Sequence, residues 1–249
     1  MKLRLPKRTP RPVGGQMSIV DHLGEFRRRF IICIVAIVIG GIVCFILSPY
    51  IISYLIRFYR EALHDPHKDL QFLGPLDAFA TRLKIATYGG IVLALPVWLF
   101  QLWRFITPGL NPKERKYAIP FVLSSIVLFL FGGVVALLTL KPALAFLLNI
   151  GGADLRPNLT ADKYLSLVAL MIVAFGAAFE FPVILMFLLL ARVLTTQKLR
   201  QWRRWAIIGI FVFAAVITPS QDPYSLFAMA IPMLVFYEAT IVIGRLLKR

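Results

Sequence analysis

The sequence has little charge, and few of its charges are negative. Of its 249 residues only 16% are Asp, Glu, Lys or Arg, and 12 acids stand against 28 Lys and Arg. A soluble globular chain is typically about 25% charged and about 45–50% apolar, whereas 59% of this chain is hydrophobic. This composition excludes an ordinary soluble protein and indicates an integral membrane protein with several apolar spans.

The residues that carry most enzyme chemistry are also scarce. The three histidines and two cysteines show no zinc-ligand spacing. The sequence has no glycine-rich phosphate loop, no nucleophile elbow and no pair of aspartates within a span. Cys33 and Cys44 are separated by about 16 Å along a helix, so they cannot bridge each other. We therefore expect no catalytic residues, no metal, no cofactor and no use of ATP by this chain.

Long apolar stretches dominate the remaining sequence and predict an all-α integral membrane protein. In lipid the backbone polar groups must be satisfied internally, so helices are the default spans. Six transmembrane helices are predicted at Phe30–Leu47, Ile85–Trp103, Tyr117–Leu140, Tyr164–Ala191, Trp205–Ile217 and Leu226–Gly244. Pro182 predicts a kink in the long fourth segment. The fifth segment is short for a hydrocarbon core of about 30 Å.

The basic residues predict the orientation of these segments. The N-terminal tail, the 104–116 and 192–204 loops and the C-terminus hold 20 of the 28 Lys and Arg, and the opposite loops hold 8. Lys and Arg collect in cytoplasmic loops, so both termini are predicted to be cytoplasmic. This reading explains the net charge of +16 without nucleic acid. Residues 1–16 are basic and rich in Pro and Gly, which predicts a disordered arm before a membrane domain at 17–249.

Two stretches on the predicted outer side are more than linkers. Residues 49–63 mix apolar and aromatic residues with a few charges, and residues 142–150 begin with a proline suited to a helix start. Both are predicted to be short amphipathic helices that cover the outer end of the bundle.

Glu180 is the only ionisable residue between Leu165 and Ala191. An unpaired charge is costly at this depth in a membrane, and such residues are usually functional. We expect Glu180 to offer a hydrogen-bonding group to a partner helix or an ordered water. The alternative is a structural acid whose partners lie within its own bundle.

Glu25 and Glu114 are isolated acids in basic segments of the predicted cytoplasmic face. Two interpretations are open. The acids could pair internally, for example Glu25 with Arg29 one helical turn away. Alternatively, they could select a ligand with two well-placed arginines, because an arginine binds a carboxylate through two parallel hydrogen bonds.

Several motifs resemble those of the TatC family, the multi-spanning receptor subunit of the twin-arginine protein translocase. "HLGEFRRR" resembles the opening motif HLxELRxR, and "FITPGLNPKER" fits F-x-x-P-x-L-x-x-x-E-R. "FGAAFEFPV" resembles the fourth-span motif, and "ITPSQDPYS" resembles the outer turn before the sixth span. The family-motif positions are His22, Leu23, Glu25, Arg27, Phe105, Pro108, Leu110, Glu114, Gly176, Glu180, Pro182, Pro219 and Asp222. Asp77 departs from the family, which usually has Glu there.

The resemblance implies a receptor for folded cargo proteins whose signal peptides carry two consecutive arginines. Glu25 and Glu114 would hold the arginines on the cytoplasmic face of the inner membrane, with Arg27 and Phe105 shaping the site. The family fold is a concave, glove-like bundle with Glu180 in its hollow. TatA- and TatB-like single-span partners, self-association in a larger complex and transport driven by the proton-motive force are also implied. The alternative function is a proton-coupled secondary transporter that uses Glu180.

Overall fold

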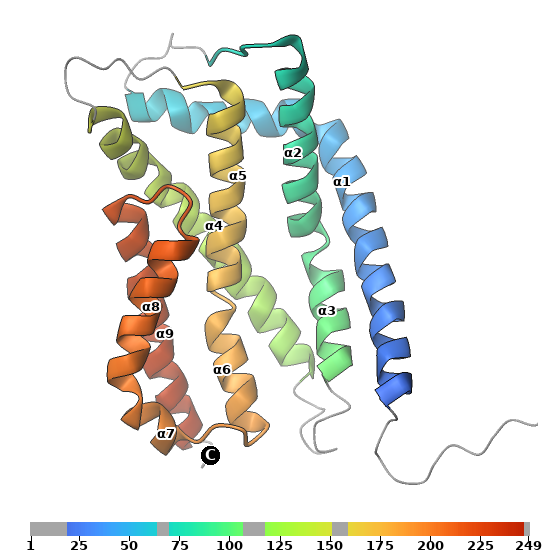
Figure 1. Ribbon diagram of the computed structural model, residues 1–249, viewed down its shortest axis with the longest axis vertical. Helices are drawn as coiled ribbons and strands as arrows, with labels where there is room; N and C mark the ends of the chain where they lie inside the picture. The colour runs from blue at the N-terminus through green and yellow to red at the C-terminus, as the bar shows by residue number, and fades with distance from the viewer. Residues whose placement is uncertain (1–18, 64–69, 107–117, 151–158, 247–249) are drawn as a thin grey trace, which may run out of the picture.

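The computed structural model describes residues 19–63, 70–106, 118–150 and 159–246. Within these ranges the chain forms nine α-helices, and a single isolated β-bridge joins Gln71 to Thr160. Helices α1 to α3 lie along one side of the molecule, α4 crosses behind α5, and α8 and α9 lie on the other side (Figure 1). The prediction of an all-helical fold is confirmed for the described residues.

Helix α1 runs from Ile19 to Leu63 without a break and contains Pro49. Its second part turns across the upper end of the bundle in Figure 1. Proline has no N–H for the helix ladder, so a bend at Pro49 has a local cause. Ser53 Oγ donates to the Pro49 carbonyl at 2.9 Å. Residues 49–63, which were expected to cover the outer end of the bundle, are thus the second part of the first helix.

Helices α2 (Pro75–Leu93) and α3 (Leu95–Ile106) cover the single span predicted there, with a bend of 52° between them. Pro96, in the first turn of α3, has no N–H to continue the ladder of α2. The indole N–H of Trp98 instead donates to the Ile91 carbonyl at 3.0 Å. At the other end of α2, the Asp77 carboxylate accepts the backbone N–H of Gly74 at 2.8 Å and caps the helix.

Helix α4 extends from Ala118 to Asn149 with Pro142 inside it. The prediction that Pro142 begins a separate helix is wrong, because the third span continues through it. One missing N–H removes one ladder bond and the neighbouring bonds remain, so a long apolar helix tolerates the proline.

Helices α5 (Ala161–Ala178) and α6 (Phe181–Leu190) form the fourth predicted segment. The break between them falls at Phe179 and Glu180, and Pro182 is the second residue of α6, which confirms the predicted interruption. The start of α5 is capped by Thr160 Oγ1, which accepts the Lys163 N–H at 3.4 Å.

Helices α7 (Thr196–Gln201), α8 (Arg203–Ile217) and α9 (Pro223–Leu246) complete the bundle. Helix α8 ends at Ile217, and the next residue, Thr218, is extended because Pro219 follows it. Asp222 is 1% exposed and caps α9, since its Oδ1 accepts the Ser225 N–H at 2.8 Å. Pro219 and Asp222 thus end one helix and begin the next.

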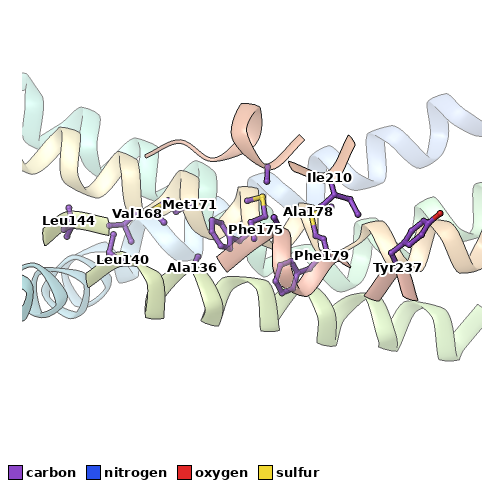
Figure 2. Close-up of a cluster of buried hydrophobic side chains, with 14 of the residues drawn as sticks. Ala136, Leu140, Leu144, Val168, Met171, Phe175, Ala178, Phe179, Ile210 and Tyr237 are labelled. Atoms are coloured by element: carbon purple, nitrogen blue, oxygen red, sulfur yellow. The ribbon is translucent and has the colours of Figure 1, made fainter. Parts of the chain in front are cut away.

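The core gathers around α5. Buried side chains from α4, α5, α8 and α9 form this core, and Phe175 and Phe179 lie at the centre of the cluster (Figure 2). Both phenylalanines are 0% exposed. The backbones of α4 and α5 approach so closely that a Cβ on Gly132 would lie 2.6 Å from the Phe175 carbonyl oxygen.

Four segments of the described chain are long and apolar enough to cross a membrane, and the bent pair α2–α3 makes up to five. These correspond to the first, third, fourth, sixth and, for the bent pair, second predicted spans. Helix α8 occupies the fifth predicted span, but with 15 residues it is too short to count among these membrane-length segments. The chain is a multi-pass membrane protein, and the count of six spans stays a prediction.

Candidate functional site: the junction of α1 and α3

Three aromatic and imidazole rings hold the start of α1 against the end of α3. The rings of His22 and Phe105 stack with centroids 4.4 Å apart, and Phe26 meets Phe105 edge-on at 5.6 Å. Such ring pairs contribute about 0.5–1.5 kcal/mol beyond their area burial. Two of the predicted site positions, His22 and Phe105, therefore touch although they are far apart in the sequence.

Glu25 lies one turn further along α1 and pairs with Arg29. Arg29 Nε donates to Glu25 Oε1 at 3.0 Å, and Nη2 donates to the same oxygen. Arg29 Nη1 also donates to Gln101 Oε1 of α3 at 3.2 Å. The internal pairing that the sequence left open is present within α1, and the bond from Arg29 to Gln101 ties α1 to α3.

The second carboxylate oxygen of Glu25 differs from the first. Oε2 is shielded from solvent and has no hydrogen-bond partner among the described residues. The carboxylate lines a small cavity of about 170 Å³ together with Arg28, Arg29, Ile32, Gln101 and Arg104. Arg29 therefore uses only one of the two carboxylate oxygens of Glu25. The other oxygen can accept a hydrogen bond from a further donor.

An apolar groove of about 460 Å³ continues from this cavity, and Arg29 and Gln101 line both. The groove lies between α1 and the bent pair α2–α3, with Phe30, Ile37 and Leu102 among its walls. An acidic group beside an apolar groove suits a ligand that joins a cation to an apolar stretch.

The other predicted positions near this site fall into two groups. Leu23 is 62% exposed and Arg27 is exposed, so neither is fixed by packing. Glu114, Pro108 and Leu110 lie outside the described residues, on the segment that follows α3.

Gln101 was missed by the sequence reasoning, because a lone amide inside an apolar segment matches no quoted motif. One signal could have found it: Gln101 lies one helical turn before Phe105 on the same helix face.

Asp77 also gains a role that the sequence did not supply. Its Oδ2 accepts the N–H groups of Leu73 at 3.0 Å and Gly74 at 2.8 Å at the start of α2. Because this is the third position of a capping box, where Glu is common, Asp performs the same task with a shorter side chain.

Glu180 lies far from this junction, at the break between α5 and α6. Its side chain interacts with Ser125 of α4, and its Oε1 is enclosed without a hydrogen-bond partner among the described residues. Gly176, which lies one helical turn before Glu180, packs against the ring of Phe129. The nearest atoms of that ring lie 2.7 Å from where a Gly176 Cβ would be.

A further apolar cavity of about 410 Å³ is bounded by α1, the α2–α3 bend, α4 and α5. Its lining includes Cys44, Tyr88, Pro96, Leu130 and Ile172 but not Glu180. The expectation that Glu180 projects into a hollow of the bundle stays a prediction. Among the described residues no group of His, Cys, Asp and Glu could hold a metal ion.

The nine helices of the described residues, with several membrane-length apolar segments, define a multi-pass α-helical membrane protein in which one carboxylate, Glu25, lies among basic side chains at one end. The family model described as Sec-independent protein translocase protein (TatC) matches residues 21–232. The chain belongs to this TatC family and is a subunit of the twin-arginine translocase.

Individual relatives agree over almost the whole chain. The TatC protein of Frankia casuarinae is 44% identical over 253 residues, covering 98% of this chain and 70% of that protein. The TatC protein of Aquifex aeolicus is 38% identical, covering 94% and 97%. The crystal structure of a twin-arginine translocase receptor, TatC, superposes with a TM-score of 0.74 at 37% identity and covers 92% of this chain and 100% of that one.

Proposed function

We propose that this chain is the signal-peptide receptor of its translocase. It binds the paired arginines of a folded cargo protein at the junction of α1 and α3. The observation that carries the proposal is Glu25, whose Oε2 lies unpartnered among the described residues in a cavity beside an apolar groove. The chain itself performs no catalysis, and the proton-motive force drives export.

In this proposal Glu25 and Glu114 each hold one arginine. The guanidinium group suits a carboxylate because it offers two parallel donors in a fixed plane. Phe105, which stacks on His22, shapes the wall of the site, and Arg27 keeps other polycations away. The adjoining groove receives the apolar part of the signal peptide.

The proposed topology has six spans in the inner membrane with both termini cytoplasmic. Two observations support it: the excess of Lys and Arg in the loops predicted to be cytoplasmic, and the positions of the start of α1 and the end of α9. Helix α1 begins and α9 ends at the same end of the bundle in Figure 1, which is the end that carries Glu25. Residues 1–16 form a separate basic arm, and residues 17–249 form the membrane domain.

TatA- and TatB-like single-span subunits, and further copies of this chain, complete the proposed complex. Helix α8 is about 22 Å long, less than a hydrocarbon core of about 30 Å. With α9 it presents exposed apolar side chains, including Val212 and Val235. A partner helix docks there by close packing, because lipid supplies no hydrophobic drive. Cysteine crosslinks from partners should concentrate on these two helices, and an even spread over all spans would contradict the assignment.

Peptide binding to the full-length protein in detergent tests the receptor site. Glu25→Gln and Glu114→Gln should each weaken a twin-arginine peptide by about 1.5–3 kcal/mol, or roughly 10- to 150-fold. Glu61→Gln is the matched control, since Glu61 is an exposed acid at the opposite end of the same helix α1. If Glu25→Gln binds as wild type with an unchanged melting curve, the site is wrong.

A further inference from the structure

Arg29 occupies one of the two Glu25 carboxylate oxygens that a cargo arginine would bind. Its Nε donates to Oε1 at 3.0 Å, and Nη2 donates to the same oxygen. The pair is partly enclosed, with 15% of the Arg29 side chain and 20% of the Glu25 side chain exposed. The receptor thus holds an arginine of its own on the acid proposed to recognise arginine.

We propose that Arg29 is an internal competitor for Glu25 that sets the affinity threshold of the receptor. The inference rests on the proposed function, because it concerns the same carboxylate. A cargo arginine that takes both oxygens of Glu25 must displace the Arg29 guanidinium. The binding free energy gained from the pair between the cargo arginine and Glu25 is then offset by the loss of the Arg29–Glu25 pair.

The position of Gln101 makes this exchange possible. Arg29 Nη1 already donates to Gln101 Oε1 at 3.2 Å, so the displaced guanidinium keeps one acceptor on α3. Without Gln101, the freed Arg29 would have no alternative acceptor among the groups that line this cavity, which are otherwise basic or apolar. Displacement therefore moves Arg29 toward α3.

The competition predicts that a single basic residue is not a sufficient ligand. Arg29 is tethered to the same helix as Glu25, so its effective concentration at the carboxylate is high. Every ligand that places a cation on Glu25 is weakened by the same factor. Only a ligand with a second arginine, held by another acid, gains enough to bind under these conditions.

The test is a double-mutant cycle on the full-length protein in detergent, titrated with a twin-arginine peptide. Arg29→Gln should tighten binding by about 3- to 10-fold, the range expected for losing a partly enclosed ion pair. A peptide with two lysines in place of the arginines should gain by a similar factor. In the Glu25→Gln background, Arg29→Gln should change binding by no more than the loss of one positive charge does, because there is no carboxylate left to compete for.

Arg104→Gln separates competition from simple charge removal. Arg104 lines the same cavity and contacts the ring of Phe100, 5.7 Å from the centroid, so its loss removes one positive charge without freeing Glu25. Its gain should be smaller than that of Arg29→Gln. Equal gains in the two variants would overturn the inference.

Arg29→Lys keeps the positive charge, so it is the more conservative variant in case Arg29→Gln fails to fold. An ammonium group cannot reproduce the arginine fork, so this variant should bind the peptide more tightly than wild type and less tightly than Arg29→Gln. Weaker or unchanged binding in both Arg29 variants would overturn the inference while leaving the receptor site intact. Unchanged binding in Glu25→Gln alone would instead overturn the proposed function and this inference with it.

Discussion

The α5–α6 segment and helix α1 are both long enough to cross a membrane, but they are built differently. Within their most apolar stretches, 44% of the first and 11% of the second is buried inside the protein. The α5 side has a continuous core of aromatic and aliphatic side chains. The first half of α1 presents a row of exposed apolar residues that includes Val38 and Ile42.

The contacts of the two regions differ in kind as well as in extent. Helix α1 meets α2 largely through backbone, since a Cβ on Gly90 would lie 2.7 Å from the Gly41 nitrogen. It meets α3 through rings and the Arg29–Gln101 bond. The core region keeps one geometry because many side chains interdigitate. The α1–α3 region depends on a few polar and ring contacts, which a ligand can replace.

The largest expected effect concerns Glu180, the acid inside the densely packed region. Glu180→Gln keeps the size and hydrogen-bonding capacity but cannot ionise, whereas Glu180→Ala removes both. If Glu180 is a polar docking point, cargo export should largely survive in Glu180→Gln and largely fail in Glu180→Ala. Export assays at matched membrane levels measure the difference. Equal, complete loss in both variants would instead favour a proton-carrying role for Glu180, since a carrier needs a titrating group.

The second effect tests whether α4 and α5 are held by close backbone contact. Gly132→Ala should destabilise the protein by about 1–3 kcal/mol, because the added methyl group collides with the Phe175 carbonyl. Gly209→Ala in α8 is the control, since nothing lies within 4 Å of its Cβ position. It should be neutral or stabilise the protein by about 0.5–1 kcal/mol through helix propensity. Thermal unfolding in detergent compares the two, and equal melting temperatures would refute the close contact.

The sequence predicted the helical class and the positions of most segments, because apolar run length and internal backbone bonding constrain a membrane chain strongly. It predicted the break at Pro182 and the short α8. For the other prolines it did not predict which ones break a helix. Pro49 and Pro142 lie within continuous helices, whereas Pro96 begins a new one. That outcome depends on neighbours such as Trp98, which bonds a carbonyl near the break.

The site was predicted in part for a similar reason. Motifs indicated Glu25 and Phe105, and helical spacing indicated that Arg29 could reach Glu25. Gln101 carries no motif, and its role arises only because the bend in α2–α3 brings it to α1. The position of Glu114 relative to Glu25 stays a prediction, because Glu114 lies outside the described residues.

The third effect tests the link between the core and the second part of α1. Tyr164 is 0% exposed, and its hydroxyl donates to the Leu55 carbonyl at 2.7 Å. Tyr164→Phe should cost about 0.5–1.5 kcal/mol and raise hydrogen exchange in residues 49–63. Tyr237→Phe is the matched control, since its hydroxyl bonds Leu199 at the same distance inside the other region. If both variants raise exchange in residues 49–63 equally, the bond does not anchor α1.

The smallest effect concerns the ion pair that joins the two regions directly. Lys84 Nζ of α2 lies 2.7 and 2.9 Å from the two carboxylate oxygens of Asp162 in the first turn of α5. Their side chains are 44% and 28% exposed, so water and salt weaken the attraction. A double-mutant cycle with Lys84→Met and Asp162→Asn should therefore give a coupling of about 0.2–1 kcal/mol at low salt.

That coupling should fall further in 1 M salt, where the screening length is about 3 Å. The Arg203–Glu238 pair is the comparison, because it is similarly exposed, at 45% and 48%, but joins α8 to α9 within one region. Similar coupling energies for the two ion pairs would mean that surface ion pairs hold both regions equally. The difference between the regions would then come from side-chain packing alone. A Lys84–Asp162 coupling well above that of Arg203–Glu238, and insensitive to salt, would show instead that charge fixes α2 to α5. Helix α2 would then belong with the tightly held core and not with the loosely held α1–α3 region.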